Sequence, residues 1–247
     1  MFADQMEDLE YKGRWVTDDY MAGLIEQEFA DTVAAGETLF HYTTTIQNHM
    51  SYTLDKYGES YAYPEVPLNT AVSDEVETLL RVYTEGARDA DAMLGRLVDT
   101  FSAAEEPVVL VFFGDHLPYL GDNQLAYAEL GFTARAEWDA LTSYETPYVI
   151  WANDAAKDVL GQDFLGEGPD VSSCFLMNLL FDYLGWTGDA WAQATTDIWR
   201  EIPVLTSTGS YIRNGELTTE LDPEGQALLS RYQSLEYYYG THFQYDS

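Results

Sequence analysis

The chain has 247 residues, a length that suits one large α/β domain, and its 19 tyrosines and 6 tryptophans favour a packed core over disorder. A formal net charge of −32, with lysine only at positions 12, 56 and 157, disfavours nucleic acid and anionic membrane surfaces as direct partners. No stretch approaches the roughly 20 apolar residues of a membrane span, no signal peptide is visible, and the single cysteine excludes an internal disulfide.

The first elements expected in chain order are a helix and a strand. Thr17 followed by two aspartates predicts a helix start, since a hydroxyl caps the free N–H groups and acids favour the first turn. Gly36 predicts the end of that helix. Residues 38–47 are rich in β-branched and aromatic residues and predict a strand that ends just before His49. His41 lies inside this strand, where packing in the core is the expected role.

The most secure prediction is a long helix followed by a strand. Ser73 is the expected cap, and apolar residues then recur at three- and four-residue steps as far as Phe101. Residues 108–113 are apolar on both faces, as in a central strand covered by helices on each side. A helix leading into a parallel strand is half of a βαβ unit, and residues 38–47 supply the other half.

Gly114, Asp115 and His116 follow that strand directly. In open α/β sheets, ligands bind beyond the carboxyl ends of the strands. A carboxylate oxygen beside an imidazole nitrogen is a mixed donor set that suits manganese or zinc better than calcium. Such a pair also occurs in caps and surface turns, so the three residues alone leave both interpretations open.

The remaining elements fit a single domain. Residues 125–141 are mixed and helical in part, and residues 146–152 form another short apolar strand. Ser172 predicts the cap of a helix that ends at Gly185 and includes Cys174 as a core residue. Beyond it the pattern becomes irregular, with short antiparallel strands around an Asn-Gly turn at 214–215 and a final helix over 226–239.

Four motifs then occur in a known order: Asn48–Tyr52, Asp89–Gly95, Phe113–Pro118 and Glu145–Asn153. Together they resemble the sulfatase-like catalytic domain of the lipoteichoic-acid synthase and phosphoglycerol transferase family, within the alkaline-phosphatase-like superfamily. The likeness runs from about residue 15 to residue 185. It implies an α/β fold with a mostly parallel sheet sandwiched between helices and a small C-terminal antiparallel part. Residues 1–247 would be one partial domain, with its core over 15–185 and a subdomain over 186–247.

The resemblance also implies a reaction. A Thr or Ser nucleophile takes a phosphoglycerol-type headgroup from a phospholipid, and an acceptor in the cell envelope then receives it. A divalent metal, manganese with zinc or magnesium as alternatives, polarises the phosphoryl oxygens. Asp115 and His116 map onto two metal ligands of the family, and His49 maps onto a substrate-binding histidine.

The chain departs from the family pattern in two places. Met50 and Ser51 stand where family members often have Gly-Pro, which thins the motif around His49. The strands that carry the nucleophile and an acidic metal ligand have no counterpart before residue 38, and Thr43–Thr45 lie within a predicted strand. No catalytic residue is therefore assigned in this chain, which is expected to be an N-terminally truncated fragment, soluble and inactive alone.

Three hypotheses remain open from the sequence. The first is the phosphoglycerol transferase, which would act at the extracellular face of a bacterial cell membrane and reach that membrane through a region not in this chain. The second is a sulfatase or phosphodiesterase of the same superfamily, although Cys174 is too far along the chain to be a sulfatase nucleophile. The third is a non-catalytic partial domain.

Overall fold

The structure is a computed structural model that describes residues 6–133 and 143–242. These residues form two compact units: the first comprises residues 6–133 and 146–159, and the second comprises residues 143–145 and 160–242. The expected organisation, one domain with a core over 15–185 and a subdomain over 186–247, stays a prediction. The part of the 125–141 prediction that covers residues 134–142 lies outside the described residues.

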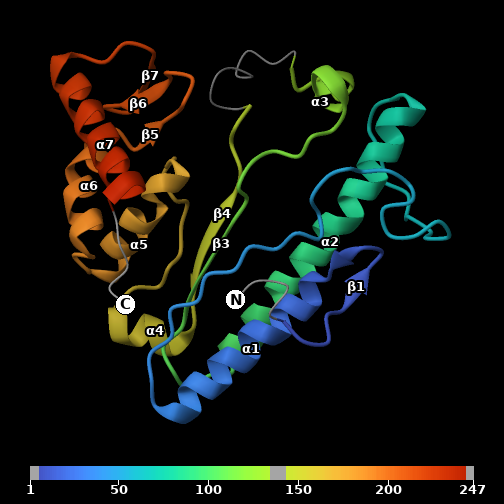
Figure 1. The fold of residues 1–247 in the computed structure, drawn as a ribbon, viewed down its shortest axis with the longest axis horizontal. Helices are drawn as coiled ribbons and strands as arrows, with labels where there is room; N and C mark the ends of the chain where they lie inside the picture. Colours follow the sequence, from blue (N-terminus) through green and yellow to red (C-terminus); the bar gives the residue numbers. More distant parts are fainter. Residues whose placement is uncertain (1–5, 134–142, 243–247) are drawn as a thin grey trace. The chain divides into compact units, whose positions relative to one another are not determined.

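The chain up to residue 160 forms short strands, two long helices and a pair of longer strands (Figure 1). In chain order these are β1 (Tyr11–Lys12), β2 (Trp15–Val16), α1 (Asp18–Ala35), α2 (Asp74–Ser102), β3 (Val109–Phe113), the 3-10 turn η2 (Asp122–Gln124), α3 (Leu125–Glu129), β4 (Tyr148–Ala152) and α4 (Asp154–Leu160).

Both long helices begin where the sequence predicts. The Thr17 hydroxyl accepts the Tyr20 N–H at 3.1 Å at the start of α1, and Gly36 ends that helix in the left-handed conformation. The Ser73 hydroxyl accepts the Val76 N–H at 3.3 Å at the start of α2. These bonds satisfy N–H groups that a helix cannot satisfy internally, which is why a short-range signal located them.

One core cluster of the first unit lies between the two long helices and the β3–β4 pair. Its buried centre and the half-buried residues packed on it come from all four elements: Ala22, Met93, Leu97, Phe101, Ile25, Phe29, Val108, Leu110, Phe112 and Trp151. Alternate residues of β3 face this core, and among the described strands β3 pairs with β4 alone, so it is not the central strand that the sequence predicted. The packing fixes the direction in which β3 ends, and hence where residues 114–116 lie.

The pairing of β3 differs from the prediction. β3 and β4 are antiparallel, with Val109 opposite Ala152 and Phe113 opposite Tyr148. Every strand pair among the described residues is antiparallel, so the expected mostly parallel sheet is not confirmed in this part of the chain. Single-strand patterns show that a segment is extended, whereas pairing direction depends on contacts distant in sequence.

The predicted strand over 38–47 is not formed. Residues 38–45 make no backbone–backbone hydrogen bond within the described structure, although the alternation expected of a strand persists, with Phe40 and Tyr42 exposed on one side. His41 was predicted to be a core residue. Instead it is half-buried, and its Nδ1 lies 2.6 Å from the Glu28 carboxylate on α1. The segment is extended, but among the described residues it has no partner strand, so no βαβ unit results.

The second unit is helical with a small sheet (Figure 1). Its elements are the 3-10 turn η3 (Ser173–Phe175), α5 (Leu176–Leu184), α6 (Ala190–Glu201), β5 (Val204–Leu205), β6 (Tyr211–Arg213), β7 (Glu216–Thr218) and α7 (Pro223–His242). The predicted C-terminal antiparallel part is confirmed by the order β5-β6-β7. Asn214 and Gly215 have φ values of 54° and 76°, as a tight hairpin turn requires.

Two predictions for this unit were wrong in detail. Ser172 does not cap a helix, because its hydroxyl exchanges two 2.9 Å hydrogen bonds with the Leu205 backbone. Cys174 is exposed rather than packed in the core. Both residues lie at the 3-10 turn that precedes α5. The predicted helix began at Ser172, about one turn before α5 begins, so it assigned these side chains to the wrong face.

Candidate functional site

The β3 strand delivers Asp115 and His116 to the surface. Gly114 leaves the strand against β4, where the Thr146 hydroxyl donates to its carbonyl at 2.8 Å. A Cβ on Gly114 would lie only 3.2 Å from the Thr146 Cβ, so a larger residue there would push the loop away. The next two side chains are 78% and 66% exposed, which leaves both open to a ligand.

Local hydrogen bonds orient the two side chains. Asp115 Oδ1 accepts the His116 N–H at 2.9 Å, and Asp115 Oδ2 lies 3.5 Å from His116 Nε2. His116 Nδ1 lies 2.9 Å from the Leu117 carbonyl, and because a carbonyl only accepts, Nδ1 is the donor. In the neutral ring Nε2 then carries a lone pair. A histidine whose other nitrogen is held in this way is the usual arrangement of a metal ligand.

His49 lies in a turn that follows the unpaired segment. Its N–H donates to the Ile46 carbonyl at 3.0 Å, and its exposed ring places Nδ1 3.1 Å from the Met50 carbonyl. The ring centroid lies 6.1 Å from that of Trp15 in β2. The Nδ1 contact leaves Nε2 of this exposed ring available to solvent or a ligand.

Three consecutive carbonyls around His49 are held by side chains of the segment that follows. The Tyr57 hydroxyl donates to the carbonyl of Gln47 at 3.4 Å, and the Tyr52 hydroxyl donates to that of Asn48 at 2.9 Å. The Lys56 ammonium donates to the carbonyl of His49 itself. These bonds fix the backbone of an exposed turn that has no strand ladder to support it.

All three residues predicted for the site lie in the first unit. Burial raises the pKa of the Tyr52 hydroxyl, with smaller contributions from Tyr83, Tyr127 and Asp115. In the described part of the chain no three His, Cys, Asp or Glu side chains lie close enough to hold a metal. The metal role of Asp115 and His116 and the substrate role of His49 stay predictions.

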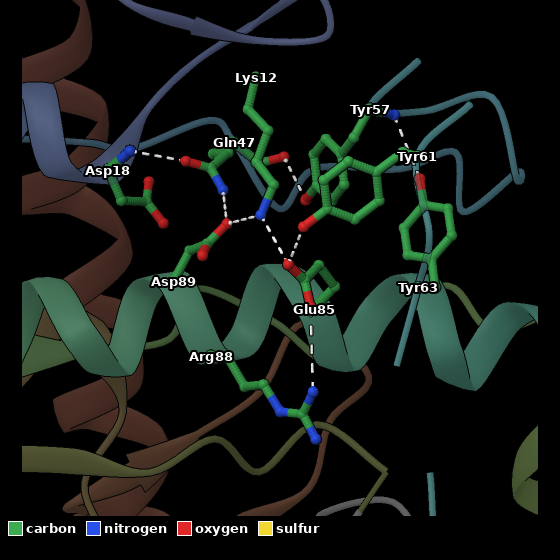
Figure 2. Close-up of polar contacts among 9 residues, drawn as sticks. All are labelled: Lys12, Asp18, Gln47, Tyr57, Tyr61, Tyr63, Glu85, Arg88 and Asp89. Carbon is green, nitrogen blue, oxygen red and sulfur yellow. Dashed lines mark hydrogen bonds and ion pairs between the residues drawn. The ribbon is translucent and has the colours of Figure 1, made fainter. Parts of the chain in front are cut away.

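A buried polar network lies beneath this turn, and the sequence interpretation missed it. Figure 2 shows the Lys12 ammonium between the carboxylates of Glu85 and Asp89 on α2, at 2.8 and 2.6 Å. The Gln47 side chain, almost completely buried, donates to Asp89 and accepts the Asp18 N–H at 2.8 Å. The i,i+4 pair of acids on α2 was the available signal, but such pairs usually face solvent.

Charge pairing and burial shift the pKa values in this network in opposite directions. Burial would lower the pKa of Lys12, but its bonds to Asp89 and Glu85 raise it well above its usual value. Burial raises the pKa of the Asp18 carboxyl to about 6, with a further contribution from Asp89. The carboxylates of Asp89 and Glu85 therefore stabilise the charge of Lys12, whereas burial and Asp89 destabilise the charged form of Asp18.

Comparison with known proteins gives the class. A family model described as Sulfatase matches residues 4–185, and the chain therefore belongs to the sulfatase family. A Rhizobium meliloti (strain 1021) protein named for cyclic beta-1,2-glucan modification is 27% identical over 155 residues, which are 61% of this chain and 23% of that protein.

Among solved structures, the Streptococcus pyogenes phosphoglycerol transferase GacH in complex with sn-glycerol-1-phosphate matches with a TM-score of 0.60 and 17% identity. That match covers 95% of this chain and 52% of the other. The chain thus spans about half of the GacH chain and about a quarter of the curated relative. These findings confirm the family resemblance seen in the sequence and a sulfatase-like, alkaline-phosphatase-like fold.

Within the described residues, no helix combines the length and the apolar character that crossing a bilayer needs.

Proposed function

We propose that this chain is part of a metal-dependent transferase that moves a phosphoglycerol-type headgroup from a phospholipid to a glycopolymer or lipid of the cell envelope. A Thr or Ser nucleophile would carry the group as a covalent intermediate, and we assign that nucleophile to no residue of this chain. The protein would work at the extracellular face of a bacterial membrane. Its partners would be the phospholipid headgroup and the envelope acceptor.

The observation that carries this proposal is the arrangement of Asp115 and His116 at the end of β3. The two side chains are exposed and adjacent, and the imidazole is oriented so that Nε2 lies 3.5 Å from Asp115 Oδ2, which brings a nitrogen and an oxygen donor together. They fit a divalent metal as two of its ligands, with further ligands coming from residues that this arrangement does not include. Their oxygen and nitrogen donors favour manganese, with zinc or magnesium as alternatives. When bound, the metal would polarise a phosphoryl oxygen.

His49 supports the same function. With Nδ1 held by the Met50 carbonyl, a protonated ring would donate from Nε2 to a phosphoryl or glycerol oxygen. The fixed backbone carbonyls of residues 47–49 keep this nitrogen in one place, which a positioning role requires.

The test uses the intact protein with manganese and phosphatidylglycerol labelled in the headgroup. Asp115→Asn should lower transfer by at least the roughly 10- to 100-fold that loss of even an outer-shell partner of a metal costs. The matched control is Asp91→Asn, at an exposed position on α2, which should leave the rate unchanged. Equal rates for Asp115→Asn and Asp91→Asn would refute the assignment.

The sulfatase description of the family model supports a second candidate, hydrolysis of sulfate or phosphate esters. Aryl sulfate and aryl phosphate esters in the same assay separate the two functions, because a transferase releases labelled headgroup only to an acceptor. Turnover of the aryl sulfate without headgroup transfer would favour the hydrolase, and no turnover of any substrate would favour a non-catalytic domain.

A further inference from the structure

Most lysines and arginines among the described residues have a carboxylate partner. Among the described residues, the lysines and arginines with a carboxylate oxygen within 4.0 Å are Lys12, Arg81, Arg88, Arg96, Lys157, Arg200, Arg213 and Arg231. The two described residues that lack such a partner are Arg14 and Lys56. Although the chain has a net charge of −32, these two cations leave a local positive charge that no nearby carboxylate neutralises.

Both unpaired cations lie against Trp15. The Arg14 guanidinium carbon lies 5.7 Å from the Trp15 ring centroid, and the Lys56 ammonium lies 4.2 Å from it. The His49 ring is the third neighbour, at 6.1 Å. The indole Nε1 is buried and has no hydrogen-bond partner in the described structure. One tryptophan thus gathers two cations and the histidine predicted to bind substrate.

The two cations differ in exposure. Arg14 is exposed, and its charge helps to lower the pKa of Asp55, after the hydrogen bonds of Asp55 to Thr53 and to its own backbone. Lys56 is buried, with its ammonium also 5.6 Å from the Tyr52 ring. Burial, with the charge of Arg14, lowers the pKa of Lys56 to about 8, which still leaves a cation at neutral pH.

Cation–π attraction accounts for part of this arrangement but not for all of it. A cation–π contact is a weak attraction, whereas a buried ammonium without a carboxylate partner loses much of its favourable hydration. The single hydrogen bond from Lys56 goes to the His49 carbonyl. The lost hydration therefore falls on Lys56, the residue that holds the backbone of His49.

We propose that Arg14, His49 and Lys56 form a recognition site for a phosphate group, with Trp15 at its centre. Arg14 and His49 contact the anion, because both are exposed and a guanidinium matches phosphate oxygens in a two-pronged geometry. Lys56 is a positioning residue that holds the His49 backbone and adds positive charge below it. The inference rests on the proposed function and deepens it by naming Arg14 and Lys56 as residues of the substrate site.

The first experiment measures binding by the chain as it stands. Histidine-labelled protein is titrated with sn-glycerol-1-phosphate and, in a separate arm, with inorganic phosphate, and the His49 ring resonances are followed by NMR. We expect saturable shifts, and Arg14→Gln should weaken binding by about tenfold or more, the effect of losing one charge-assisted hydrogen bond. The matched control is Arg88→Gln, an exposed arginine on α2, which should change affinity by less than about twofold because it has no role at the site.

The second experiment isolates the positioning role. Lys56→Met should move the His49 resonances in the free protein and weaken binding, whereas Lys56→Arg, which keeps the charge and a donor, should restore both. Circular dichroism checks that each variant is folded, and the exposed Arg14→Gln variant tests the site even where Lys56→Met does not fold. Tighter binding of sn-glycerol-1-phosphate than of phosphate supports recognition of the glycerol as well, and equal binding supports recognition of phosphate alone.

The outcomes separate this inference from the proposed function. Unchanged binding in Arg14→Gln and unshifted His49 resonances in Lys56→Met would overturn the site, and so would wild-type protein that binds neither ligand, whatever the transfer assay shows. If Asp115→Asn instead retains full transfer while binding still depends on Arg14, the metal assignment is lost and the phosphate site stands.

Discussion

Replacing Asp18 with asparagine should stabilise the protein at neutral and alkaline pH. Asp18 is 1% exposed, and neither carboxylate oxygen has a hydrogen bond of good geometry in the described structure, although the Thr45 hydroxyl lies near enough to favour the charged form. Burial, followed by repulsion from Asp89, raises its pKa from 3.8 to about 6. The ionised side chain is therefore a cost to the folded state that a neutral amide of the same shape avoids.

The magnitude follows from the pKa shift. A rise of the pKa from 3.8 to about 6 corresponds to about 3 kcal/mol, at about 1.4 kcal/mol for each tenfold change in the ionisation constant. Because the folded pKa is raised, the contribution of Asp18 to stability is complete below about pH 4 and is lost as the pH rises towards and through 6. The Asp18→Asn variant should thus be about 2–3 kcal/mol more stable than wild type at pH 8 and nearly equal to it at pH 4.

The assay is urea unfolding at five pH values between 4 and 8, followed by circular dichroism. Asp91→Asn removes an exposed aspartate from α2 and should show no pH-dependent difference from wild type beyond about 0.5 kcal/mol. A gap between Asp18→Asn and wild type that does not grow with pH, or a variant less stable than wild type at pH 8, would refute the electrostatic reasoning.

Two further predictions concern backbone contacts in the first unit, and both are measured by urea unfolding at pH 7. Gly86→Ala would place a Cβ 2.1 Å from the Asn48 side-chain oxygen, so it should cost about 1–3 kcal/mol, whereas Gly95→Ala on the same helix meets nothing within 4 Å and should stabilise by about 0.5–1 kcal/mol. Stabilisation by both would show that α2 does not press on the turn before His49. Asn153→Ala should cost about 3–4 kcal/mol, because its buried amide accepts the Val108 N–H at 3.0 Å and donates to two carbonyls before β3. A loss no larger than that of the exposed control Asn69→Ala would contradict that role.

The helices were predictable because their signals are local. Thr17 and Ser73 cap the helices that they were expected to cap, and each bond spans only three residues. The same logic applied to Asp189 would have located α6, since its carboxylate accepts the Ala192 N–H at 2.9 Å. The interpretation of that region as irregular missed this cap because tryptophans and threonines obscured the apolar period.

Strand pairing was not predictable in the same way. The pattern of residues 38–47 correctly indicates an extended backbone, but whether such a segment pairs depends on a partner that its own residues do not specify. The antiparallel match of β3 with β4 is likewise a property of both strands and of the chain between them. The helix-then-strand order on which the parallel prediction rested is compatible with either direction.

The candidate site shows the same division between local and distant information. The motif at Asp115 and His116 was visible because its residues are adjacent, and the structure exposes both. The contribution of Lys12 and Lys56 was not visible, because each acts through residues far away in sequence or on a backbone carbonyl. Lysines in an acidic chain are ordinarily assigned to surface ion pairs, and only the burial of Lys56 contradicts that default.

The structure gives a physical reason why an exposed turn could serve as a precise substrate contact. A loop outside any sheet normally has a mobile backbone, since water satisfies its carbonyls as well as protein does. Here Gln47 is fixed to α2 through Asp89, and Gly86 leaves the space on that helix for Asn48 to approach. The carbonyls of residues 47–49 each accept a bond from Tyr57, Tyr52 or Lys56. His49 is thereby held by side chains instead of by a ladder of strands, so removing one of the donor groups, a tyrosine hydroxyl or the Lys56 ammonium, should disturb the position of His49 before it disturbs the fold.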